Sequence, residues 1–176
     1  MRRFLLTALL LTSVPALAAD LAGVTMADSS SVAGNALLLN GMGLREKYFI
    51  DIYVAGLYLP AKTTDPAVAL DPTTAKRLAF EFIIDISKEQ LNDNLVASLR
   101  SSPASEHADT IAGWMEDIPK GGKLSMDYAP GVGTTISVKG VEKGTIPGTE
   151  AMQALFGIYL NDPPVTEALK EGLLGL

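Results

Sequence analysis

The chain has 176 residues, no cysteine, one histidine and a formal net charge of −6. A single histidine without cysteine excludes ordinary zinc sites and Cys–His nucleophiles, and the negative balance argues against nucleic acid and anionic membrane surfaces as partners. The length suits one domain, with a core large enough to hold the fold without disulfides.

The first 19 residues have the three parts of a secretory signal peptide. Arg2 and Arg3 form the basic start, residues 4–11 are almost entirely apolar, and Ala16-Leu17-Ala18 gives the small-x-small cleavage pattern. The apolar run is shorter than the roughly 20 residues that a membrane-spanning helix needs. We therefore expect cleavage after Ala18 or Ala19, a periplasmic or secreted mature protein, and no stable membrane insertion after cleavage.

Strand signals dominate the first half of the remaining chain. After a lead-in at 20–34 with a weak strand, the pattern predicts a strand at 35–39, a turn at 40–43 and a long strand at 47–59, which is rich in β-branched and aromatic residues. A loop with a short helical turn near 66–70 leads to another strand at 77–85.

Two helices, a meander and two further helices follow. Ser87 is typical of an N-cap, with Gln90 at the capping-box position. The helix after it is expected to bury Leu91, Leu95, Val96 and Leu99, and a second helix spans 105–117. Strands at 123–128, 134–138 and 144–146 precede the closing helices, one capped by Thr149 and one after Asp162-Pro163-Pro164. This order predicts one α+β domain over 35–176 with a largely antiparallel sheet.

The most informative polar residues lie in the apolar tract from Leu37 to Pro60, which contains Arg45 and Tyr53. Because a buried unpaired charge is costly, Arg45 needs an anionic partner. That partner is either a side chain such as Asp51, with Tyr53 as half-buried packing, or the acidic head of a ligand held by both residues. One continuous strand would separate the two residues by roughly 26 Å, so they share a ligand only if the chain turns back between them.

Other motifs carry no specific chemistry. His107 lies in a polar stretch and is expected to be solvated, and the glycines at 41, 43, 131 and 133 lack the continuation of a phosphate-binding loop. No metal and no cofactor are expected.

Two segments of the chain carry a family likeness. They are LNGMGLREKYFIDIYVAGLYLP, from Leu39 to Pro60, and the C-terminal part, in which VKGVEKGTIPG precedes AMQALFGIYLNDPPVTEALKEGLLG. Together they resemble the chalcone isomerase-like superfamily, in particular its exported bacterial branch, over about residues 33–176. The resemblance implies an open-faced β-sandwich, in which a layer of helices covers a large antiparallel sheet and a ligand cleft lies between them.

The resemblance also implies roles for single residues. Arg45 matches the arginine that holds and polarises the substrate in the plant enzymes that close a chalcone into a flavanone, and Asn94 matches a catalytic asparagine. Tyr53 stands where those enzymes have a threonine, and Ser87 where they have a catalytic tyrosine. The arginine–tyrosine pair instead resembles the non-catalytic fatty-acid-binding members, where it holds the carboxylate.

Three hypotheses remain from the sequence. The first is a monomeric, non-enzymatic binder of a fatty acid or a similar amphiphilic ligand. The second is an isomerase of the chalcone–flavanone type that uses Arg45, Tyr53 and Asn94. The third is a structural or interaction protein with a vestigial cleft. For the binder, the head-group residues are Arg45 and Tyr53, and the candidate tail contacts are Phe49, Leu57, Leu95, Leu99 and Trp114.

Overall fold

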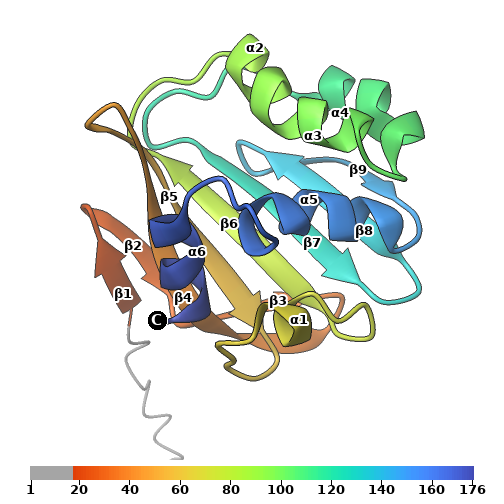
Figure 1. The fold of residues 1–176 in the computed structure, drawn as a ribbon, viewed down its shortest axis with the longest axis horizontal. Coiled ribbons are helices and arrows are strands. Elements are labelled where there is room, and N and C mark those ends of the chain that lie inside the picture. The colour runs from red at the N-terminus through yellow and green to blue at the C-terminus, as the bar shows by residue number, and fades with distance from the viewer. Residues whose placement is uncertain (1–17) are drawn as a thin grey trace, which may run out of the picture.

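The structure, a computed structural model, describes residues 18–176, so that the expected signal peptide lies almost entirely outside the described residues. Its body is a seven-stranded antiparallel sheet in which strands that follow one another in sequence are neighbours (Figure 1). The strands are β3 (Ser29–Val32), β4 (Asn35–Lys47), β5 (Ile50–Leu59), β6 (Lys76–Phe82), β7 (Lys123–Ala129), β8 (Gly133–Val138) and β9 (Val141–Ile146). Strands β1 (Ala18–Leu21) and β2 (Val24–Ala27) form a separate hairpin, which includes the last two residues of the expected signal peptide and the first part of the predicted lead-in.

The helices cover one face of the sheet (Figure 1). They are α1 (Pro66–Ala69), α2 (Lys88–Leu91), the π-helical turn η1 (Asn92–Val96), α3 (Ala97–Arg100), the 3₁₀ turn η2 (Ser105–His107), α4 (Ala108–Trp114), α5 (Glu150–Leu160) and α6 (Glu167–Leu174). The main core lies between this layer and the sheet. This is the α+β open-faced sandwich that the sequence predicts. Between residues 18 and 176, no helix is long and apolar enough to cross a membrane.

Strand β4 is continuous where the sequence predicts a turn at 40–43. Gly41 and Gly43 do not reverse the chain but let α6 approach it, because a Cβ on Gly41 would lie 2.2 Å from the carbonyl oxygen of Gly172. Asn40 occupies a register shift in the strand, and its buried Nδ2 donates to the carbonyl of Leu173 at 2.8 Å. The turn prediction was wrong because the glycines serve a close contact with a distant helix.

The predicted long strand at 47–59 is also wrong in one respect. The chain reverses at Tyr48 and Phe49, so that Lys47 pairs with Ile50 and the tract becomes the β4–β5 hairpin. Both turn residues have positive φ angles, 53° and 64°. The turn escapes sequence analysis because neither residue is a turn former.

The helical predictions hold with shifted ends. The capping box of Ser87 and Gln90 is present, and the four apolar residues predicted after it are buried. The second helix begins as a 3₁₀ turn and ends at Trp114 rather than at 117. Thr149 precedes α5, but its side chain makes no capping hydrogen bond.

A second, smaller core lies on the other face of the sheet. The β1–β2 hairpin packs Val24 and Met26 against Val54 and Tyr58 of β5, and the Tyr58 hydroxyl donates to the carbonyl of Ala27 at 2.9 Å. Strand β5, which carries Tyr53, is therefore packed on both faces and held in position from both sides.

Candidate functional site

The β4–β5 hairpin brings Arg45 directly opposite Tyr53. The two residues are register partners in the antiparallel ladder, on either side of the turn at Tyr48 and Phe49. Directly opposed residues have Cβ atoms about 5 Å apart, instead of the roughly 26 Å that a continuous strand would impose. The geometric condition for sharing one ligand is therefore met.

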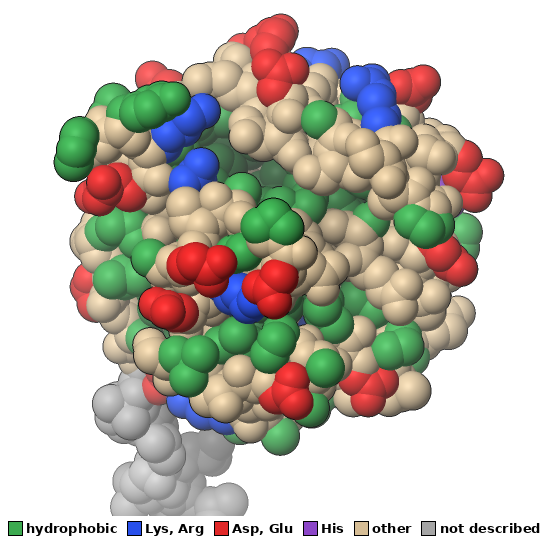
Figure 2. All heavy atoms as spheres, in the orientation of Figure 1, with side chains coloured by type: hydrophobic (Ala, Val, Ile, Leu, Met, Phe, Trp, Pro, Cys, Tyr) green, Lys and Arg blue, Asp and Glu red, His purple; other side chains and the backbone are tan. Residues whose placement is uncertain are grey.

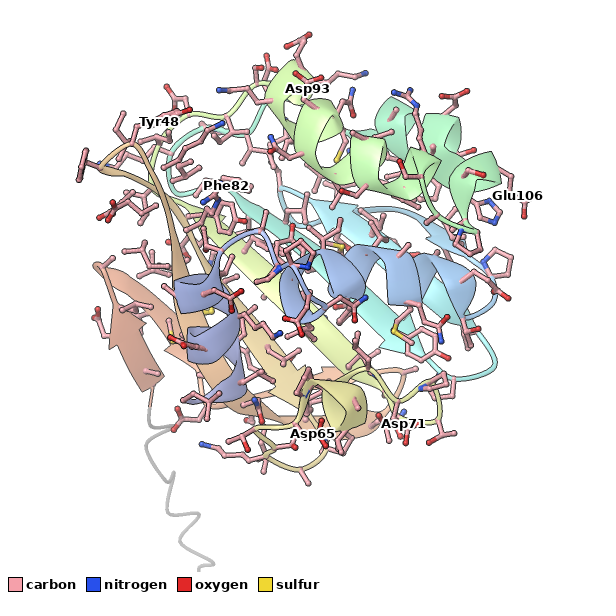
Figure 3. The ribbon with its side chains drawn as sticks, viewed as in Figure 1. Tyr48, Asp65, Asp71, Phe82, Asp93 and Glu106 are labelled. Atoms are coloured by element: carbon pink, nitrogen blue, oxygen red, sulfur yellow. The ribbon has the colours of Figure 1, made fainter. Side chains whose placement is uncertain are left out.

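Both residues line a cavity of about 310 Å³ between the sheet and the helices. Its sheet side comes from β4, β5, β6 and β7, and its other side from the α2–η1 segment and the end of α5. The lining residues are Arg45, Lys47, Ile52, Tyr53, Phe80, Phe82, Ile86, Gln90, Leu91, Asp93, Asn94, Leu95, Leu124, Ile158, Tyr159 and Val165. Figure 2 shows a hollow with a hydrophobic floor and basic side chains at its rim. Phe82 on the sheet and Asp93 on the helical side are labelled in Figure 3.

Tyr53 sits in an aromatic cluster. Its ring meets Phe80 and Phe82 edge to face, with centroids 5.4 and 5.6 Å away, and Phe80 lies 5.2 Å from Tyr159. Such contacts add to the burial energy of the rings and hold the phenol of Tyr53 in place. The cavity is thus apolar along its wall and has hydroxyl groups at defined points.

The two phenols in the cavity stay protonated. Burial raises the pKa of Tyr53, and the charge of Arg45 and the interaction with the Tyr159 hydroxyl offset this only in part. Burial also raises the pKa of Tyr159, helped by its proximity to Tyr53. Both hydroxyls are therefore neutral hydrogen-bond donors throughout the physiological pH range.

Arg45 has no carboxylate partner within the described residues 18–176. Its Nη1 donates to the backbone carbonyl of Glu46 at 2.7 Å, and no acid within residues 18–176 lies at ion-pair distance from it. Asp51, the sequence-based candidate, lies opposite Glu46 in the register of the β4–β5 ladder, not opposite Arg45. The interpretation that Asp51 neutralises Arg45 is thus wrong, and the guanidinium keeps donors for an anion in the cavity.

Leu95 and Asn94, two further predicted residues, also line the cavity. Both belong to η1, and π-helical turns often occur at functional sites. The Asn94 amide is partly engaged, because its Nδ2 donates to the carbonyl of Gln90 at 2.6 Å. Ser87 does not line the cavity and instead caps α2, so the position that matches the plant tyrosine contributes no hydroxyl group.

Four predicted tail contacts lie elsewhere. Phe49 is 97% exposed at the hairpin turn, because the chain reverses there. Leu57 and Leu99 are fully buried in the main core without reaching the cavity. Trp114 packs over Gly144 of β9, where an added Cβ would lie 2.5 Å from its ring.

Several lining residues were not predicted from the sequence. Phe80 and Phe82 alternate on β6, a pattern that marks one face of a strand, and Tyr159 lies on α5, the helix predicted after Thr149. Lys47 was not noticed as a second cation beside Arg45. Over residues 18–176, no group of three or more metal-ligating side chains converges.

Comparison with known proteins agrees with this architecture. The family described as chalcone isomerase-like matches residues 18–175. No curated protein matches the sequence significantly. Among solved structures, the chain is similar to a fatty-acid binding protein of Arabidopsis thaliana, with a TM-score of 0.71 and 13% identity over 90% of this chain and 96% of that one. The structural similarity shows a shared fold, and the family match shows that the chain belongs to the chalcone isomerase-like family.

Proposed function

We propose that this protein binds a fatty acid or a similar amphiphilic carboxylate, without catalysing a reaction, in the cavity headed by Arg45 and Tyr53. The observation that carries the proposal is the Arg45 guanidinium, which lines a largely apolar cavity and faces a neutral phenol across the hairpin. No carboxylate of residues 18–176 forms an ion pair with it. A ligand carboxylate would satisfy the donors of both groups with charge-assisted hydrogen bonds.

The remaining lining fits an acyl chain. Beyond the polar end, β6, β7 and the end of α5 contribute aromatic and aliphatic side chains, and the helical side contributes Leu91 and Leu95. The polar side chains of Gln90, Asp93 and Asn94 also line the helical side. The volume of about 310 Å³ falls at the lower end of the roughly 300–1,000 Å³ typical of small-molecule sites. A similar solved structure is that of a fatty-acid binding protein, which supports this class of ligand.

The direct test is a calorimetric titration of the protein with oleate in a solution without vesicles. Arg45→Ala should weaken binding at least about tenfold, because it removes a charge-assisted pair. Arg100→Ala is the matched control, since Arg100 lies on α3, does not line the cavity and pairs with the exposed Asp109. Unchanged oleate affinity in Arg45→Ala would overturn the proposal.

An independent test uses the protein from its own cell envelope. Native mass spectrometry should show a bound mass of the fatty-acid type in the wild type and none in Arg45→Ala. The same spectra report the N-terminus. Export to the periplasm or the medium predicts a mature chain that begins at Ala19 or Asp20, and an intact N-terminus would contradict it.

One observation favours a second candidate, an isomerase of the chalcone–flavanone type. Tyr53 and Tyr159 place two protonated phenols beside a guanidinium, an arrangement able to stabilise a developing oxyanion. This activity predicts turnover of 2′-hydroxychalcone above the spontaneous rate, with a loss in Arg45→Ala. A rate equal to the spontaneous one removes this candidate.

A further inference from the structure

Three consecutive hydrophobic side chains at the end of the β4–β5 hairpin lie in solvent. Tyr48 is 82% exposed, Phe49 97% and Ile50 54%. We call these three residues the hairpin tip. Figure 3 labels Tyr48 at the outer end of the hairpin, and Figure 2 shows hydrophobic side chains projecting at the same corner.

The turn geometry makes this choice of residues unusual. A two-residue turn with positive φ at both positions favours asparagine and glycine. Three other turns within residues 18–176 have positive φ at both positions, and each has glycine second: Ala22-Gly23, Ala33-Gly34 and Lys139-Gly140. The turn at Tyr48 and Phe49 differs from these three because its second residue is not glycine and both of its residues are aromatic.

Stability of the folded chain therefore does not explain the hairpin tip. Its backbone is strained for aromatic residues, and the rings bury almost no surface in return. The benefit of the rings must come from contact with something outside the monomer.

The position of the hairpin tip indicates what that contact serves. Lys47 adjoins the tip on β4, and Ile52 follows the tip by two residues on β5; both line the cavity. The paired residues Arg45 and Tyr53 come next along the two strands, away from the tip. A surface that touches the hairpin tip thus faces the side of the cavity that carries its cationic head.

We propose that the hairpin tip inserts into the interface of a lipid bilayer and holds the cavity against the membrane, from which the amphiphilic ligand enters. Tyr48 has an aromatic ring with a polar hydroxyl, which favours this interface, and the apolar side chains of Phe49 and Ile50 favour the acyl region next to it. Lys47, whose Nζ lies 5.7 Å from the Tyr48 ring centroid, extends a cation towards the head groups. The identity of the ligand rests on the proposed function, whereas docking itself does not.

Charge and area define the partner. The hairpin end carries two basic residues, Arg45 and Lys47, and two acidic residues, Glu46 and Asp51, so its formal net charge is zero. Because the whole chain is acidic as well, the attraction is hydrophobic and requires no anionic lipid. A stable protein interface buries about 800 Å² on each partner, whereas three side chains of this size supply on the order of 500 Å². A small insertion into lipid fits this area better than a second protein does.

The test is flotation with vesicles of phosphatidylcholine alone. The variant Tyr48→Asn/Phe49→Gly has the preferred turn residues, so it should fold with an unfolding midpoint no lower than that of the wild type. We expect the wild type to float and the variant to bind vesicles at least about fivefold more weakly. The control Val132→Asn removes another hydrophobic side chain, 54% exposed, from the β7–β8 loop and should float normally.

A fluorescence measurement gives a second readout. The emission of Phe49→Trp should shift to shorter wavelength when vesicles are added, whereas that of Val132→Trp should not. Unchanged flotation of the Tyr48→Asn/Phe49→Gly variant, or failure of the wild type to float, would overturn the docking proposal. So would a concentration-dependent dimer that the same double substitution abolishes, since the tip would then bind a second copy.

Oleate titration without vesicles separates the proposal of ligand binding from the proposal of membrane docking. The double variant should keep the oleate affinity of the wild type, and Arg45→Ala should lose that affinity but still float. Arg45→Ala with unchanged oleate affinity and unchanged flotation would overturn the proposed function while supporting docking.

Discussion

Gly43 of β4 lies against Leu169 of α6 so closely that a Cβ on the glycine would stand 2.5 Å from the Leu169 carbonyl oxygen. No side chain fits this gap without moving the helix. Because α6 follows Val165, which lines the cavity, this contact also positions one wall of the site.

Gly43→Ala is therefore expected to destabilise the fold by about 1–3 kcal/mol, the range for overpacking a close contact. Urea unfolding provides the measurement. The control is Gly113→Ala on α4, where nothing lies within 4 Å of an added Cβ, and a gain of about 0.5–1 kcal/mol is expected there. Equal effects of the two substitutions would contradict the close-contact interpretation.

Substituting the residues that this type of turn prefers at the hairpin tip should stabilise the folded protein. Tyr48→Asn/Phe49→Gly replaces two strained aromatic residues with types that accept positive φ, so the free energy of unfolding should rise by about 1–2 kcal/mol. Thermal unfolding measures the change. A lower midpoint would mean that the rings stabilise the folded state in spite of their exposure.

Tyr53→Phe should weaken oleate binding by about tenfold with little effect on the fold. It removes the hydroxyl but keeps the ring and its contacts with Phe80 and Phe82. Calorimetric titration gives the affinity, and Tyr58→Phe is the matched control, since Tyr58 packs on the other face of the sheet. Equal loss in both variants would show a general effect rather than a contact with the ligand.

Alkaline pH should destabilise the protein through the cavity tyrosines. Burial raises the pKa of Tyr53 and Tyr159, whereas tyrosines in the unfolded chain ionise near pH 10. Above about pH 10 the unfolded chain releases protons that the folded chain keeps, so stability falls by up to about 1.4 kcal/mol per pH unit and tyrosine. The slope should flatten in Tyr53→Phe, and an unchanged slope would contradict the assignment.

Lys76 should produce the opposite trend at lower pH. It is fully buried, its Nζ donates to the carbonyl of Asp71 at 2.5 Å, and burial lowers its pKa to about 8. Between about pH 8 and 10, the unfolded chain holds the proton that the folded chain has lost, so stability rises with pH. Urea unfolding across this range should show the rise in the wild type and not in Lys76→Met.

Local patterns predicted the elements well, because strand alternation and the capping box of Ser87 depend on neighbours in sequence. They failed where a residue type that is typical of one structure occurs in another. Gly41 and Gly43 resemble a turn in the sequence. In the structure they leave room for α6, which lies some 130 residues further along the chain. Tyr48 and Phe49 look like strand, but they form a turn that lacks the usual residues.

The candidate site shows the same limit. Arg45 and Tyr53 were identified because a cation and a phenol are unusual in an apolar tract. Four of the five predicted tail contacts do not line the cavity, because core and cavity walls use the same residue types. Leu57 and Leu95 differ only in whether their buried side chains border a space, which no local pattern records.

The pairing of β4 with α6 has a consequence for the order in which the molecule is completed. Asn40 is held by the carbonyl of Leu173, and Val165 finishes the cavity wall, so residues near the end of the chain close a site whose head lies in its first third. The sheet alone does not enclose the cavity, because this wall comes from the segment that ends in α6. The proposed binding site is therefore complete only when α6 has packed against β4.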